Sequence, residues 1–241
     1  AENMANGTAT GDMAPYPNEF NSAAELLALC AAQDKSIAEI KRENELSRRS
    51  AAELDKGMVQ LWEVMTTCID RGLERDGILP GGLNVKRRAK GIYDALLAER
   101  GLNMSAPHTI NDWMSVYAMA VNEENAAGGQ VVTAPTNGAA GVVPATIRYW
   151  LDHVPDATTR KIPEFLLTAA AIGGLIKFNA SISGAECGCQ AEVGSPASMA
   201  ASGCGAASVG TPSHAETAAA SSFQPHLRLT SLPAQRILPA P

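Results

Sequence analysis

The chain has 241 residues, of which 46% are hydrophobic, 18% are charged and 5% are aromatic. This composition is typical of a globular chain with one sizeable core, and it excludes a largely disordered protein. The formal net charge of -6 and the isoelectric point near 5.3 argue against a surface for nucleic acids or anionic membranes.

Targeting signals and disulfides are not indicated by the sequence. No basic flank precedes an apolar segment near the N-terminus, so we expect no signal peptide. The longest uncharged apolar run, residues 165–176, is too short to span a bilayer. Five unevenly spaced cysteines do not form a disulfide framework and favour a reducing compartment. We therefore expect a cytoplasmic protein that binds a small molecule, not a nucleic acid or a membrane.

Helix signals dominate the chain after its first residues. Residues 1–20 lack periodicity and contain turn formers, so we expect a linker or a disordered tail there. Two helices should follow, because Ser22 precedes Glu25 and Ser36 precedes Glu39 at the spacing of a capping box. Apolar periodicity and start signals predict further helices near residues 51–74, 88–100, 111–125, 142–151 and 163–179.

Strand signals are weak, which leaves a helical fold class. The best strand candidate, residues 131–133, is short and leads into a proline. Cys30 and Cys68 fall on apolar helix stripes, which favours buried thiols. After about Ser195 the chain is rich in small residues, and we expect little core-forming power there. The predicted fold class is all-α, with Gly-rich loops between central helices forming the site.

Three loops beside apolar helices could present backbone N–H groups to an anion: residues 122–129, 134–141 and 181–190. Each loop alone is a weak signal, because most Gly-rich loops are only connections. The last loop contains Cys187 and Cys189, and carboxylates lie close to both.

Two thiols at alternating positions can ligate a soft metal or an iron–sulfur cluster, but they do not complete such a site. Cys204, His214 and His226 lie downstream at spacings that match no zinc pattern. From the residues alone, a metal or cluster site and a pair of small buried thiols both stay open.

Two long motifs contain these loops: VNEENAAGGQVVTAPTNGAAGVVPA at 121–145 and NASISGAECGCQAEVGS at 179–195. They resemble the α-domain of the bacterial iron–sulfur L-serine dehydratases, also called L-serine ammonia-lyases. The likeness continues through LPGGLNVKRRA at 79–89 back to about Tyr16. It implies a helical domain over residues 21–195.

The resemblance also implies a chemistry. Such a domain binds a [4Fe–4S] cluster by three cysteines, and the open iron acts as a Lewis acid on the serine hydroxyl. Loss of the α-proton and hydroxide gives aminoacrylate, then pyruvate and ammonia, a step of amino-acid catabolism that feeds gluconeogenesis. No pyridoxal phosphate is needed. A homodimer, or a separate chain carrying the regulatory β-domain, is the partner that the resemblance implies.

Site residues can be transferred by position. Cys189 stands where the family has its first cluster ligand, in Gly-Cys-Gln, whereas Cys187 replaces a residue that is usually aliphatic. No residue is assigned to removal of the α-proton. The expected substrate pocket, in which backbone N–H and hydroxyl groups hold the serine carboxylate and amine, contains Thr136, Asn137, Gly138, Ser181, Ser183 and Gly184.

The chain departs from the family pattern towards its end. The family's other two ligands lie in Thr-Cys-Asp-Pro and Val-Pro-Cys, but residues 230–233 are Thr-Ser-Leu-Pro and the sequence stops at Pro241. We expect residues 196–241 to be a divergent or truncated part of the domain. The alternative function is an inactive fragment or non-catalytic subunit that binds an amino acid or a partner chain. A third hypothesis is a zinc or thiol-redox enzyme that uses Cys-Gly-Cys.

Overall fold

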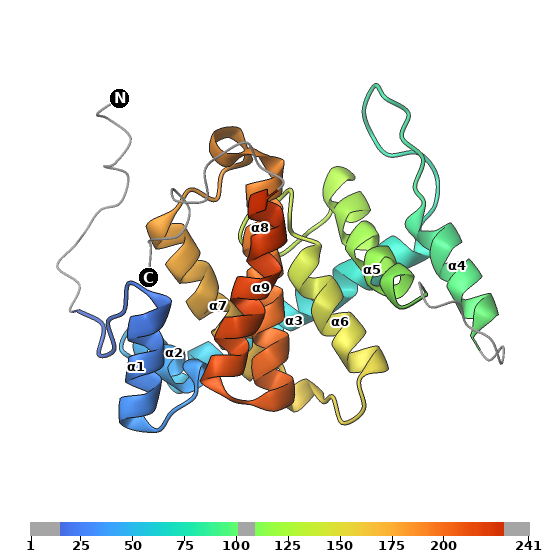
Figure 1. Cartoon of the computed structure of the whole chain (residues 1–241). Helices are drawn as coiled ribbons and strands as arrows, with labels where there is room; N and C mark the ends of the chain where they lie inside the picture. Colours follow the sequence, from blue (N-terminus) through green and yellow to red (C-terminus); the bar gives the residue numbers. More distant parts are fainter. Residues whose placement is uncertain (1–14, 101–108, 229–241) are drawn as a thin grey trace.

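The computed structural model describes residues 15–100 and 109–228 (Figure 1). This part of the chain contains nine α-helices and one short 3-10 helix, η1, and no strand. The all-α class is therefore confirmed, and the strand considered at residues 131–133 does not form. The elements are α1 (Ala23–Gln33), α2 (Ile37–Leu46), α3 (Ala51–Glu74), α4 (Ala89–Glu99), α5 (Thr109–Ala126), α6 (Val142–His153), η1 (Thr159–Lys161), α7 (Ile162–Asn179), α8 (Gly184–Val209) and α9 (Pro212–Arg228).

Serine side chains begin the first three helices. Ser22 Oγ accepts the backbone N–H of Glu25 at 3.2 Å at the start of α1. Ser36 and Ser50 each form a complete capping box with the glutamate three residues later. Each cap stabilises its helix by about 1 kcal/mol. The two helix starts predicted from serine–glutamate spacing are confirmed.

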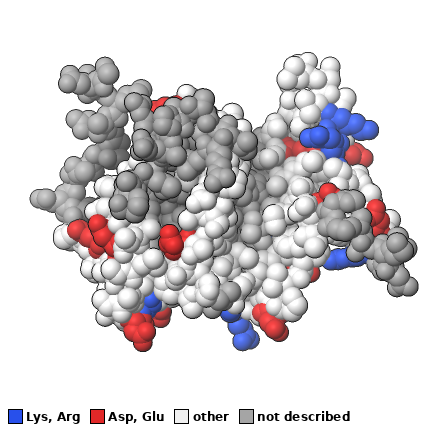
Figure 2. Space-filling view, viewed as in Figure 1, with Lys and Arg blue, Asp and Glu red and all other residues white. Residues whose placement is uncertain are grey.

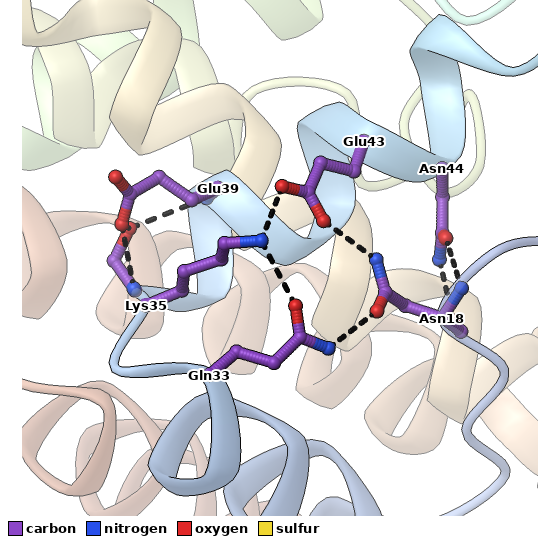
Figure 3. Close-up of polar contacts among 7 residues, drawn as sticks. Asn18, Gln33, Lys35, Glu39, Glu43 and Asn44 are labelled. Carbon is purple, nitrogen blue, oxygen red and sulfur yellow. Dashed lines mark hydrogen bonds and ion pairs between the residues drawn. The ribbon is translucent and has the colours of Figure 1, made fainter.

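The segment before α1 is tied to α1 and α2 by a polar network centred on Asn18 (Figure 3). The buried Asn18 backbone N–H donates to Asn44 Oδ1 at 2.9 Å, and Asn44 Nδ2 donates to the Asn18 carbonyl at 2.7 Å. The Asn18 side chain also bonds Glu43 and Gln33. Residues 15–20 thus lie against the helices, and the rest of the expected tail lies outside the described residues.

Helix α7 is the central helix, as its apolar sequence predicts. Its buried residues join one cluster with α1, α2 and α9, and another with α6 and α8. Residues 159–179 are long and apolar enough to cross a membrane, but half of this window is buried inside the protein. Phe165 is fully buried, with its ring centroid 6.5 Å from that of Trp150. The helix is therefore an integral part of the core.

Helix α8 packs against α7, and α9 packs along α8 (Figure 1); together they correct one expectation. Residues after 195 do form core, through buried alanines and Phe223. A β-carbon at Gly203 would lie 2.5 Å from the Phe165 ring. Small residues let the helices approach closely, so a stretch with few large side chains still packs densely.

Residues 77–87, called the arm below, stand away from the helices between α3 and α4 (Figure 1). Leu79 N donates to Val85 O at 2.8 Å, and Arg87 N donates to Gly77 O at 2.8 Å. Leu83 at the tip is 88% exposed. Basic side chains colour this side of the molecule blue in Figure 2.

Candidate functional site

The connections before α6 and α8 meet at one carboxylate. Thr136, in the connection between α5 and α6, donates its hydroxyl to Glu192 Oε1 at 2.5 Å. Glu192 lies near the start of α8 and is half-buried. The contact joins two of the motifs that resemble the L-serine dehydratases, although the residues are 56 positions apart.

Two glycines make room for this carboxylate. A β-carbon at Gly138 would lie 2.9 Å from Glu192 Oε1, and one at Gly184 would lie 2.3 Å from Glu192 Oε2. Real β-carbons essentially never approach an oxygen so closely, so both positions require glycine while Glu192 keeps this position. Thr136, Gly138 and Gly184 therefore surround a single side chain.

Ser181 and Ser183 are arranged around a second carboxylate. The Ser181 hydroxyl donates to Glu186, and the Ser183 backbone N–H donates to Ser181 Oγ at 3.1 Å. Ser183 precedes α8 but makes no side-chain cap to it. These serines thus gather around Glu186, at the start of α8.

Asn137 is held within its own loop. Its backbone carbonyl accepts from Asn125 Nδ2 at 3.0 Å, and its side-chain oxygen accepts from the Thr133 hydroxyl. Asn125 is at the end of α5, so these bonds fasten the loop to that helix. The loop then leads into α6, whose N-cap Gly141 makes no side-chain cap.

Residues 181–190 are not the loop that their composition suggests. Helix α8 begins at Gly184, and only Gly188 departs from helical geometry, with φ 80° and ψ 158°. This conformation is nearly restricted to glycine. The exposed Cys189 follows the kink and precedes Glu192 by three residues, so their β-carbons lie about 5–6 Å apart on one helix face.

The other described thiols lie elsewhere. Cys30 and Cys68 are buried in separate core clusters, as predicted, and burial raises the pKa of each thiol. Burial also raises the pKa of Cys204, which packs against the core formed by α6, α7 and α8. Cys204 follows Cys189 by four helical turns, or about 22 Å along α8.

The positions of the cysteines show whether this chain can hold a [4Fe–4S] cluster with three thiolates. Only Cys189, among the cysteines whose side chains are described, lies at the candidate site. No group of three His, Cys, Asp or Glu side chains within the described ranges could hold a metal ion. The described residues therefore do not fit a three-thiolate [4Fe–4S] site. Residues 230–233, where the family has a further ligand, lie outside the described part.

Comparison with known proteins gives the family. The model of the family described as serine dehydratase alpha chain matches residues 32–231. An L-serine dehydratase of Streptomyces coelicolor is 47% identical over 94% of this chain and 48% of its own length. L-serine dehydratase TdcG of Escherichia coli is 45% identical over 90% of this chain and 48% of its own. An L-serine dehydratase of Mycobacterium tuberculosis is 47% identical, covering 92% of this chain and 48% of its own.

The chain spans about half the length of these relatives. The matched residues include the arm, the connection before α6 and the start of α8, and hence both carboxylate clusters. The family match covers most of the chain, as the resemblance of its motifs predicts. The chain belongs to the serine dehydratase alpha chain family.

Proposed function

We propose that this chain provides the substrate-binding half of an L-serine dehydratase, which deaminates L-serine to pyruvate and ammonia. The relatives bearing that name are 42–47% identical to it across most of its length. The observation that carries the proposal is the convergence of Thr136, Gly138 and Gly184 on Glu192. These residues come from two distant segments and build one polar site.

The chain's own groups suit an amino acid. The loop before α6 ends at the N-terminus of that helix, where backbone N–H groups favour a carboxylate. Hydroxyl and carboxylate groups at Thr136, Ser181 and Glu186 offer partners for the amine and the hydroxyl of serine. Binding these groups at several points would orient the α-carbon for proton removal.

The cofactor implied by the resemblance is a [4Fe–4S] cluster, which would activate the serine hydroxyl as a leaving group. Cys189 is the thiolate that this chain presents at the site, and a three-thiolate cluster would need at least one further thiolate from outside this sequence. The free thiols favour a reducing compartment such as the cytoplasm.

A second candidate function follows from the same thiols. A chain with one described thiol at the site could bind L-serine or a partner chain without turning serine over. Under this alternative the helices and the polar site are retained, but iron is not bound. The two candidates therefore differ in iron content and in pyruvate formation.

Anaerobic reconstitution with iron and sulfide tests the proposal. The full chain is incubated, desalted and assayed for iron per chain, cluster absorbance and L-serine-dependent pyruvate. Pyruvate formation that is lost in Cys189→Ala and retained in Cys204→Ala would show that this chain holds the cluster with ligands other than three thiolates, because Cys204 lies in the core, away from the site. Serine binding without iron or pyruvate would support the second candidate instead.

A further inference from the structure

Glu192 is a carboxylate that lacks a cationic partner within the described side chains. Its Oε1 accepts from the neutral Thr136 hydroxyl at 2.5 Å, and no ion pair within 4.0 Å involves it in the described part of the chain. The side chain is half-buried, so it has lost part of its hydration. A carboxylate in this position is stabilised strongly by a cation that enters the site.

We infer that Glu192 binds the α-ammonium group of L-serine, an inference that rests on the proposed function. The ammonium group supplies the positive charge that the described protein side chains do not. The Thr136 hydroxyl oxygen can accept a further proton of the ammonium group. A small organic cation suits the site better than a metal ion, because the described residues hold no three-ligand metal group.

Two glycines and one cysteine border the Glu192 carboxylate. Gly138 and Gly184 bring two backbone segments against the Glu192 carboxylate, so the carboxylate is held between them. Cys189 lies one helical turn before Glu192 on the same face. An amino group bound at Glu192 would therefore hold the rest of a three-carbon amino acid close to Cys189.

Glu192 would also assist the chemistry. An ionic partner keeps the amino group protonated, and a positively charged nitrogen withdraws electrons from the α-carbon. The α-proton is then more acidic than it is beside a neutral amine. The role of Glu192 is to bind the substrate and hold this charge; the group that removes the proton is a separate one.

The test compares two ligands that differ in the amino group. L-serine and 3-hydroxypropionate share a carboxylate and a hydroxyl, but only L-serine carries the ammonium group. Binding of each is measured by calorimetry with the full wild-type chain and with Glu192→Gln, Glu192→Asp and Glu63→Gln. Glu63 is exposed on α3, so its variant controls for the loss of one carboxylate elsewhere.

Glu192→Gln is expected to weaken L-serine binding roughly ten- to hundredfold, the loss of one charge-assisted hydrogen bond. Binding of 3-hydroxypropionate should stay within about twofold, because no ammonium group is involved. Glu192→Asp keeps the negative charge, so it should bind L-serine more tightly than Glu192→Gln does, while its binding of 3-hydroxypropionate stays the same. Glu63→Gln should bind both ligands as the wild type does.

Two results would overturn the inference separately from the proposed function. If Glu192→Gln binds L-serine as tightly as the wild type, Glu192 does not hold the ammonium group although the site binds serine. If it weakens both ligands equally, its role is structural, and circular dichroism will show whether helicity is lost. If the wild-type chain binds no L-serine, the proposed function itself fails.

Discussion

Glu124 is fully buried and lies within ion-pair distance of three arginines at the base of the arm. Arg87 Nη2 is 2.9 Å from Glu124 Oε1, and Arg75 and Arg71 are 3.3 Å and 3.4 Å from Oε2. Arg87 is itself buried, and its Nη1 has no hydrogen-bond partner in the described structure. The Glu124 carboxylate thus balances the charge of arginines that precede the arm and of Arg87 at its end.

Glu124→Gln should therefore destabilise the fold by about 3–5 kcal/mol, because it leaves a buried arginine without its charge partner. Glu45→Gln is the matched control. Glu45 is half-buried and pairs with Lys41 and with the exposed Arg49, and loss of such partly hydrated pairs costs about 1 kcal/mol or less. Urea unfolding followed by circular dichroism measures both; equal effects would contradict the role given to Glu124.

His153 provides a pH-dependent contribution to stability. It stacks on Tyr149 with ring centroids 4.7 Å apart, and its Nε2 is buried with no hydrogen-bond partner in the described structure. Burial lowers the pKa of His153 from its usual 6.5, although Asp152 opposes the shift. Near and below pH 6.5 the unfolded chain therefore binds more protons than the folded chain.

The folded state should consequently lose stability as the pH falls from 7 through about 6.5 towards the lowered pKa. His153→Phe keeps an aromatic ring against Tyr149 but removes the titrating group. We expect a shallower decline of unfolding free energy between pH 7 and 5.5 in this variant. Parallel declines in variant and wild type would exclude His153 as the cause.

At the scale of whole elements, helices α3 and α5 approach so closely that glycine is required between them. A β-carbon at Gly72 would lie 2.4 Å from the carbonyl oxygen of Ala120, a backbone atom that cannot move by itself. Gly57, on the same helix, has nothing within 4 Å of the corresponding position. The two glycines of α3 therefore have different physical roles.

Alanine substitution should act in opposite directions at these positions. Gly72→Ala forces α3 from α5 and should cost about 1–3 kcal/mol. Gly57→Ala improves helix propensity and should stabilise by about 0.5–1 kcal/mol. Thermal unfolding of the two variants, compared with the wild type, measures the contrast. A melting temperature raised by both substitutions would show that α3 and α5 can separate freely.

The helices could be predicted from local sequence patterns, but the arrangement of the candidate site depends on contacts between residues far apart in the sequence. Ser36 and its glutamate lie three residues apart, so their capping box could be inferred from spacing. The bond between Thr136 and Glu192 depends on packing between α6 and α8, which no local pattern contains. Glu192 is one of the carboxylates close to the cysteines in the sequence, but it was not among the expected site residues. Gly184 was expected in the substrate pocket, and in the structure it permits a close approach to Glu192 from within a helix.

On the scale of the molecule, helices from before and after the arm pack together in each of the main hydrophobic clusters. Cluster residues of α3 pack with those of α4, α5 and α6, while residues of α1 and α2 pack with α7 and α9. The arm itself is joined to the rest mainly at its base. The fold is therefore held by contacts between its two parts more than by the chain that links them.

Cleavage of the arm should leave the two parts together. A specific protease site inserted between Gly82 and Leu83, both exposed, would cut the chain without touching a helix. We expect the fragments to elute as one particle in size-exclusion chromatography with helicity unchanged. The uncut insertion variant is the control, and fragments that separate would show that the link itself holds the parts in place.

The positions of residues 138, 184 and 192 are coupled in space, because the Glu192 carboxylate lies where a side chain at either glycine would begin. Either glycine can gain a side chain only if the carboxylate moves or shortens, since both β-carbons would occupy its space. A relative with a smaller residue at the position of Glu192 is free to carry alanine or serine at the other two. Because the carboxylate is the end of a flexible side chain, a side chain at either glycine would displace it from the Thr136 hydroxyl before it disturbed the backbone.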